Sequence, residues 1–141
     1  MNSRRKGATF ERMIANKIAS CTALDVHRGL GQARSGKVAP DVDLPGYWIE
    51  CKHRNTVDPD GALDQARRDA VGTTRIPVAI WRATGARGIY VTTYVSSAFD
   101  FAGLTLAGLA VTVPFDDWLE AIAARFNPRI PSPNPTGGSP L

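Results

Sequence analysis

The stretch that most constrains the fold covers residues 40–52 and reads PDVDLPGYWIECK. It predicts two short strands joined by a turn at Pro45 and Gly46. This pair favours a type II turn, which splays paired strands and does not match their twist. The two-residue period of a strand gives the second strand an apolar face and a charged face. The two sets are Tyr47, Ile49 and Cys51 on one face, and Trp48, Glu50 and Lys52 on the other.

The pairing of the two strands decides which side chains meet. If Pro45 and Gly46 are the only loop residues, Asp41 lies opposite Glu50. Directly opposed residues have Cβ atoms roughly 4.5–5.5 Å apart, where like charges repel each other. Two carboxylates at that separation indicate a site for a divalent cation. The alternative is an exposed hairpin whose charges face water, and a bulge would shift the pairing.

Length and composition favour one soluble domain. The chain has 141 residues, and its hydrophobic and charged fractions are 43% and 21%. We expect a folded domain over residues 1–126 and a disordered Pro/Gly/Ser-rich tail over residues 127–141. Apolar runs are too short for a membrane span, and no signal-peptide core follows the basic residues near the start. The expected location is the cytoplasm, which would be the host cytoplasm for a phage protein.

Basic residues gather in the first half of the chain, near the carboxylate hairpin. Together with a formal net charge of +4, this asymmetry predicts a polyanionic partner such as DNA. The alternative is an ordinary solvated surface. The candidate DNA-binding residues are Arg4, Arg5, Lys6, Arg34, Lys37, Arg54 and Arg68.

The first predicted helix runs from about Arg4 to Cys21 and carries one unexpected carboxylate. Glu11 stands at helical spacing from Ile14 and Ile18, so it lies along the apolar stripe. A carboxylate there either has a partner or lies at the edge of the stripe. An edge position would pair Glu11 with Arg12 or Lys17.

The remaining segments complete an alternating pattern of strands and helices. We expect strands over residues 24–28, 76–81, 89–95 and 110–113, and helices over residues 59–71, 98–101 and 115–126. Asp58 and Asp116 are the expected N-caps of two of these helices. This order predicts an α/β domain with a mixed sheet flanked by helices. A neutral Cys51 on the apolar face is expected to be a small core residue.

These features occur in an order that resembles the PD-(D/E)xK nuclease superfamily: an acidic residue on the first helix, a basic loop, Pro-Asp, and Glu-x-Lys on the next strand. Residues 4–12, RRKGATFER, are also similar to the opening of archaeal-type and phage Holliday junction resolvases. The resemblance covers residues 3–94, about two-thirds of the chain. It implies a restriction-endonuclease-like core and a metal-dependent endonuclease, most closely a junction resolvase.

The resemblance also implies roles for individual residues. Asp41 and Glu50 match the metal-binding acids, Lys52 matches the catalytic lysine, and Glu11 matches the first-helix acid that supports the metal. Ser35 resembles the loop serine beside the active site, and Gln65 stands where related nucleases have a helix glutamine. The implied metal is Mg²⁺, with Mn²⁺ as a substitute.

The chemistry of the residues agrees with this reading. Mg²⁺ held by Asp41, Glu50 and a backbone carbonyl of β-strand residue 49 or 51 would activate a water and bind the scissile phosphate. Lys52 would orient that water or stabilise developing charge. The alternatives are a related nuclease acting on flapped, nicked or restriction-type duplex DNA, and a DNA-binding protein that does not cleave. A junction has two strands to cut, so we expect a homodimer with a surface around Ile89, Tyr90, Phe99 and Phe101.

Overall fold

The computed structural model describes residues 2–29, 38–95, 100–101, 104–105 and 108–126. Its elements in chain order are α1 (Ser3–Thr22), β1 (His27–Arg28), β2 (Val42–Leu44), β3 (Tyr47–Arg54), α2 (Pro59–Asp69), β4 (Ile76–Ala83), β5 (Tyr90–Tyr94), β6 (Asp100–Phe101), β7 (Leu104–Thr105), β8 (Ala110–Pro114) and α3 (Phe115–Phe126). The expected tail lies outside the described residues.

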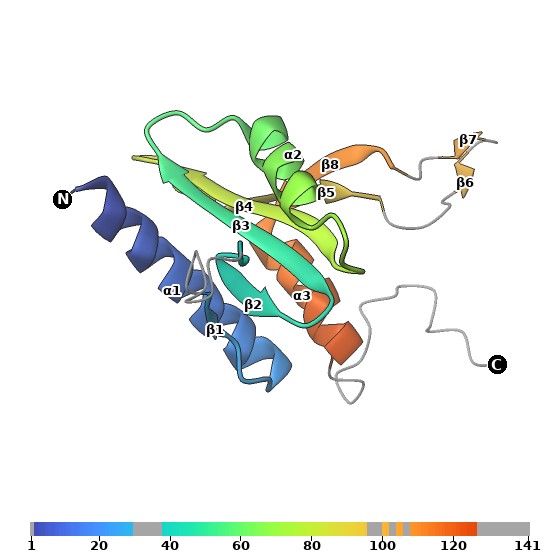
Figure 1. The fold of residues 1–141 in the computed structure, drawn as a ribbon, viewed down its shortest axis with the longest axis horizontal. Helices are drawn as coiled ribbons and strands as arrows, with labels where there is room; N and C mark the ends of the chain where they lie inside the picture. The colour runs from blue at the N-terminus through green and yellow to red at the C-terminus, as the bar shows by residue number, and fades with distance from the viewer. Residues whose placement is uncertain (1, 30–37, 96–99, 102–103, 106–107, 127–141) are drawn as a thin grey trace.

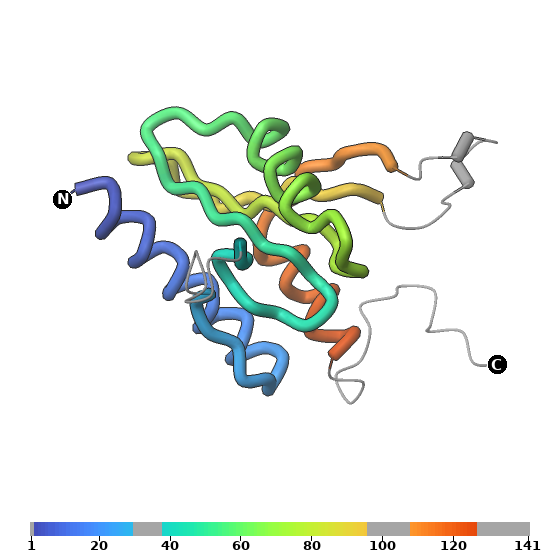
Figure 2. Tube along the Cα trace, viewed as in Figure 1, coloured from blue at the N-terminus to red at the C-terminus, as the bar shows by residue number. Residues whose placement is uncertain are grey.

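Six strands form one mixed sheet in the order β1-β2-β3-β4-β5-β8 (Figure 1). Among the strands of the described residues, only β3 and β4 are parallel neighbours, and the chain between them forms α2. Helices α1 and α3 contact each other on one face of the sheet, and α2 packs on β3, β4 and β5 from the other face (Figure 2). The predicted α/β class, with a mixed sheet flanked by helices, is therefore confirmed.

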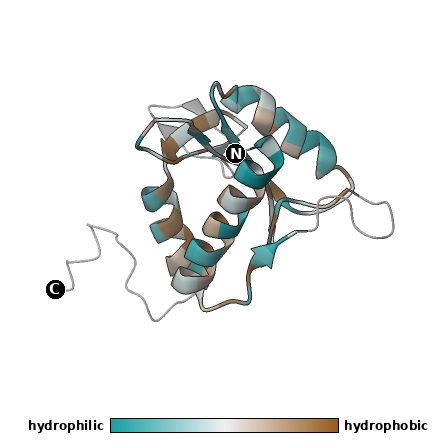
Figure 3. Ribbon diagram, turned by 90° about the vertical axis from the view of Figure 1, so that its left-hand side faces the viewer, coloured by the Kyte–Doolittle hydropathy of each residue, from teal (hydrophilic) through white to brown (hydrophobic). Residues whose placement is uncertain are grey.

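Helix α1 begins and ends with recognisable caps. The Asn2 side chain accepts a hydrogen bond from the Arg5 backbone N–H at 2.9 Å, and Ala23 ends the helix in a left-handed conformation. Its buried stripe packs on the sheet, whereas its first turns are hydrophilic (Figure 3). None of the helices within the described ranges is both long enough and apolar enough to cross a membrane.

The hairpin of β2 and β3 has the predicted register. Leu44 pairs with Tyr47 across the turn, and Gly46 has a φ of 86°, as the third position of a type II turn requires. The apolar face of β3 joins the main core through Tyr47, Ile49 and Cys51. The opposite face of β3 lies under α2.

Helix α2 starts as predicted. The Asp58 side chain caps it by accepting the Gly61 backbone N–H at 3.1 Å, and Pro59 occupies the first turn. Its inner face packs Ala66 and Ala70 on Trp48, and a neighbouring cluster joins Ala62 and Leu63 to Ala79. This packing fixes the helix over one end of β3 and β4.

Three local predictions were wrong. The first strand covers only His27–Arg28, not residues 24–28. Asp100–Phe101 forms a strand paired with Leu104–Thr105 in place of a helix, and residues 98 and 99 lie outside the described residues. Asp116 lies in the first turn of α3, not at its cap, because Phe115 already starts the helix. The buried Phe115 ring and the hydrogen bond from its N–H to the Ile89 carbonyl fix that start.

Gly29 allows the chain to approach β2 closely. Its N–H donates to the Asp41 carbonyl at 2.8 Å, and a Cβ added at Gly29 would stand 1.8 Å from the Pro40 carbonyl oxygen. Backbone atoms cannot yield as a flexible side chain does. The segment that carries Asp41 therefore depends on a glycine at this position.

Replacing Gly29 with alanine should destabilise the fold by about 1–3 kcal/mol or more, because the clash is with backbone. Urea denaturation measures this change. Gly7→Ala is the matched control, because nothing lies within 4 Å of an added Cβ there. That control should raise stability by up to about 1 kcal/mol through helix propensity. Equal effects of the two substitutions would contradict the close approach.

Candidate active site

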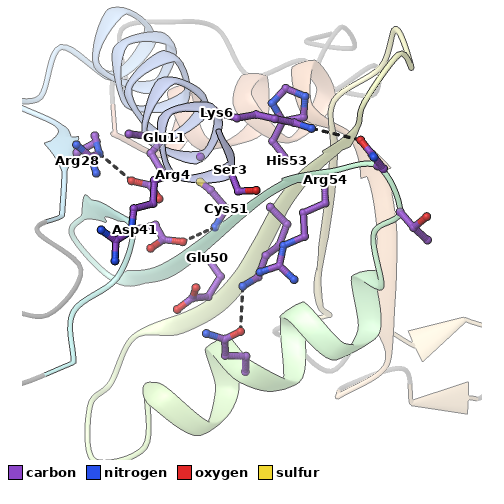
Figure 4. Close-up of a pocket in the computed structure, with 16 residues that line it drawn as sticks. Ser3, Arg4, Lys6, Glu11, Arg28, Asp41, Glu50, Cys51, His53 and Arg54 are labelled. Atoms are coloured by element: carbon purple, nitrogen blue, oxygen red, sulfur yellow. Dashed lines mark hydrogen bonds and ion pairs between the residues drawn. The ribbon is translucent and has the colours of Figure 1, made fainter. Parts of the chain in front are cut away.

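A cleft of about 1050 Å³ opens between the first half of α1, the second half of β3 and α2. Figure 4 shows the side chains that line it. Glu11, Asp41, Glu50 and Lys52 all line this cleft, although they come from separate segments of the chain. The fold therefore brings together the four residues that the sequence marked most strongly.

Glu50 is the most deeply buried carboxylate of the group. It is only 4% exposed, and the Trp48 indole N–H donates to it at a long 3.4 Å. Burial raises the pKa of Glu50 to about 8, and the nearby carboxyl group of Asp41 adds to the effect. Lys52 acts in the opposite direction but does not offset burial. The positive charge near Glu50 is therefore too small to offset its burial.

Asp41 lies where the regular ladder between β2 and β3 ends. Its N–H donates to the Ile49 carbonyl at 2.8 Å, and its side chain accepts the Cys51 N–H at 2.8 Å. The Asp41 carboxylate thus accepts the hydrogen bond from Cys51 that a backbone carbonyl would accept in a regular ladder, and this holds it beside Glu50. The carboxyl groups of Asp41 and Glu50 interact, as the predicted pairing implies. The regular ladder itself ends at Val42 and Ile49, and the Asp41 N–H bonds to Ile49 in place of Glu50.

Glu11 has a partner that the sequence did not indicate. Arg28 on β1 donates from Nε to Glu11 Oε2 at 2.7 Å, so the expected alternative pairing with Arg12 or Lys17 is wrong. Burial raises the pKa of Glu11, although the hydrogen bond from Arg28 opposes this shift. Arg28 also lines the cleft. The sequence contained no signal for this pair, because its members are 17 residues apart and meet only through packing.

Lys52 extends from the same face of β3 as Glu50. Its ammonium donates to Gln65 Oε1 on α2 at 3.1 Å (Figure 4). Gln65 thus lies beside the site, where the resemblance had placed a helix glutamine. The contact holds the Lys52 side chain along the wall of the cleft, and α2 is the element that positions it.

The predicted cationic residues divide into three groups. Arg4, Lys6 and Arg54 line the cleft, and the Lys6 ammonium also contacts side-chain oxygens of Asn55 and Thr84. Arg5 and Arg68 are exposed and do not line it. Arg34 and Lys37 lie outside the described residues, and so does the predicted loop serine, Ser35.

The carboxylates of the cleft suit Mg²⁺ better than a metal ion that takes all of its ligands from protein side chains. Among the described residues, no three side chains of His, Cys, Asp or Glu form a metal-binding group. Mg²⁺ is commonly bound through one or two carboxylates, with waters and substrate phosphates completing its octahedron. Asp41 and Glu50 meet that requirement, and a divalent cation would relieve the unfavourable burial of Glu50.

Comparisons with known proteins gave no family. No family model, no curated protein and no solved structure matches this chain.

The Glu50 carboxyl predicts a pH dependence of stability in the absence of divalent metal. Its pKa rises on folding from 4.5 to about 8, so the folded protein retains a proton that the unfolded chain releases. The contribution of this group is most favourable below pH 4.5 and is lost as the pH rises towards 8. Urea denaturation in EDTA should show this loss in the wild type and a flatter profile in Glu50→Gln. Parallel profiles for the two proteins would contradict the shift.

Proposed function

We propose that the chain is a Mg²⁺-dependent endonuclease that hydrolyses phosphodiester bonds in branched DNA. The observation that carries the proposal is the pair of Asp41 and the buried Glu50, with Lys52 beside it in a cationic cleft. A protein that only binds DNA gains nothing from two carboxylates facing phosphates, because they repel the ligand. This argument favours cleavage over binding alone.

Asp41 and Glu50 are the residues that would hold the metal, and Mn²⁺ is expected to substitute for Mg²⁺. When bound, the ion supplies charge neutralisation at the phosphate and a more acidic water. The Cys51 N–H orients one Asp41 oxygen, and the rigid strand orients Glu50. Glu11 with Arg28 forms a second charged pair at the wall of the cleft. Arg28 restrains Glu11 and leaves a guanidinium facing the same space.

Lys52 supplies the positive charge that the reaction needs near the phosphate. Its ammonium is only partly buried and is held by Gln65, a neutral acceptor. A neutral partner leaves the charge available, whereas a carboxylate would cancel it. We assign Lys52 to stabilising negative charge on the phosphate in the transition state.

The rim of the cleft suits a sugar-phosphate backbone. Arg4, Lys6 and Arg54 come from both sides of it, and cations of this kind bind phosphates without reading bases. The choice of branched DNA rests on the resemblance of residues 3–94 to junction resolvases. Flapped, nicked or plain duplex DNA remain the alternative substrates.

Asp41→Asn and Glu50→Gln should each reduce Mg²⁺-dependent cleavage below detection and retain DNA binding. Lys52→Ala should lower the single-turnover rate by roughly 10²–10³, as loss of a charge-stabilising donor does. A gel assay on a four-way junction, a flap, a single strand and a duplex measures both effects and ranks the substrates. Asp43→Asn is the matched control, because Asp43 is on the same hairpin but is exposed and pairs with Arg75 at 3.1 Å. Full activity in both Asp41→Asn and Glu50→Gln would refute the site.

We also propose that the active form is a homodimer, since one chain carries one set of these residues and a junction has two strands to cut. The residues predicted for its surface differ in how far they are exposed. Ile89 packs against the core, Tyr90 is 37% exposed, and the side chains of Phe99 and Phe101 lie outside the described residues.

Sedimentation of the full chain at assay concentration, alone and with a junction, should give the mass of two chains. Mixing the wild type with Glu50→Gln should then produce heterodimers that nick one strand of a junction. A single-chain mass under both conditions would exclude the dimer.

A further inference from the structure

A row of side chains crosses the sheet from the proposed catalytic lysine towards β8. The register pairs Lys52 with Trp81, Trp81 with Tyr90, and Tyr90 with Pro114. Paired residues in a sheet project from the same face, so this row shares the α2 face of the sheet. Neighbouring strands are about 4.8 Å apart, which places Trp81 roughly 5 Å and Tyr90 roughly 10 Å across the sheet from Lys52.

The two aromatic rings in this row form one surface. Their centroids are 5.1 Å apart, and their planes are tilted by 31°. Tyr90 is 37% exposed and Trp81 is partly buried. The indole N–H of Trp81 donates to Thr92 Oγ1 at 3.0 Å, and Thr92 is hydrogen-bonded to Thr112. These bonds satisfy the polar atom of the indole and fix the ring from its edge.

Helix α2 contacts this row at Lys52, through Gln65, and covers the preceding rows of the sheet. Its inner side chains pack on Trp48 and Ala79, which precede the row on β3 and β4. On the α2 face of β3, Arg54 follows Lys52 beside the row and is exposed. The aromatic surface therefore lies next to the cleft and has cations along its β3 side.

We propose that Trp81 and Tyr90 form a stacking platform for unpaired bases of a DNA strand whose backbone lies in the cleft. This rests on the proposed function for the position of the phosphates. Every base has an aromatic face, so stacking on Trp and Tyr binds single strands with little sequence preference. A base pair inside a duplex has no free face to offer. The platform thus selects DNA in which one strand is open beside the cut.

The charges favour nucleic acid over a second protein surface as the occupant. Lys52 and Arg54 border the row, and Arg4 and Lys6 continue the positive charge through the cleft. A strand that follows these cations with its phosphates brings its bases over the neighbouring strands β4 and β5. Aromatic rings beside a cationic groove are the combination that single-strand binding requires.

Two DNA ligands separate base stacking from attraction to phosphate. Each is a duplex with a single-stranded tail of about five nucleotides, near the lower end of known site sizes. One tail is oligothymidine, and the other carries the same phosphates on abasic residues. Affinities are measured by fluorescence anisotropy in EDTA, so that no cleavage occurs. The wild type should bind the thymidine tail about tenfold more tightly than the abasic tail.

Tyr90→Leu and Trp81→Leu should each reduce this ratio several-fold, and Tyr90→Phe should retain most of it because the ring remains. Val71→Ala, at a side chain that is 75% exposed after α2, is the matched control. The thymidine tail should also quench tryptophan emission in the wild type but not in Trp81→Phe. This readout is specific because Trp48 and Trp118 are only 5% and 8% exposed.

Equal affinity of the wild type for the two tails would overturn the platform, even if the protein cleaves DNA in Mg²⁺. The platform would also be overturned if both leucine variants kept the full preference for the thymidine tail. If the leucine variants changed the sedimentation of the protein but not the affinity ratio, the row would instead be an interface between copies of the chain. A tenfold ratio that depends on the rings, in a protein that cleaves nothing, would support the platform and refute the nuclease.

Discussion

The pairing of β2 with β3 is the constraint on which the site depends. It brings Asp41 close to Glu50 at the end of the hairpin. It also directs the apolar side chains of β3 towards the main core. A shift by one residue would exchange the two faces of the strand, bury Lys52 in the core and expose Ile49. The core and the site therefore require the same pairing of β2 with β3, because only this register buries Ile49 and leaves Lys52 at the site.

The site also shows where the molecule accepts an unfavourable interaction. Glu50 is nearly inaccessible, and its raised pKa reflects the cost of keeping a charge there beside Asp41. A buried carboxyl group without a strong partner is costly unless a cation joins it. Placing it on β3, a central strand with neighbours on both sides and helices on both faces, allows the rest of the domain to offset that cost.

The unequal cover of the sheet determines what can reach it. In the part of the chain that the structure describes, α1 and α3 cover one face, whereas α2, of 11 residues, covers part of the other. The short helix closes one wall of the cleft through Gln65, and Trp81 and Tyr90 on the same face stay partly exposed. The same face thus carries the buried Glu50 carboxyl, the ammonium of Lys52 held by Gln65, and two partly exposed aromatic rings on adjacent strands.

The local pattern determined much of this protein before any tertiary contact was known. Proline and glycine fixed the turn, the two-residue period fixed the faces of β3, and together they brought Asp41 to Glu50. Helix α2 followed in the same way from its Asp-Pro start. These features depend on neighbours within about ten residues, where backbone geometry leaves few choices. Where the local signal was weak, as at Asp116 and residues 100–101, prediction failed.

Only the tertiary structure decided which distant segments meet. Arg28 reaches Glu11, and Gln65 reaches Lys52, because the helices pack on particular strands. The order of the strands puts Trp81 beside Lys52 through the parallel pair of β3 and β4. Periodicity states which face a residue occupies but not which strand or helix will lie across from it. That choice is made by packing the whole core at once, since contacts distant in sequence are stable only when many form together.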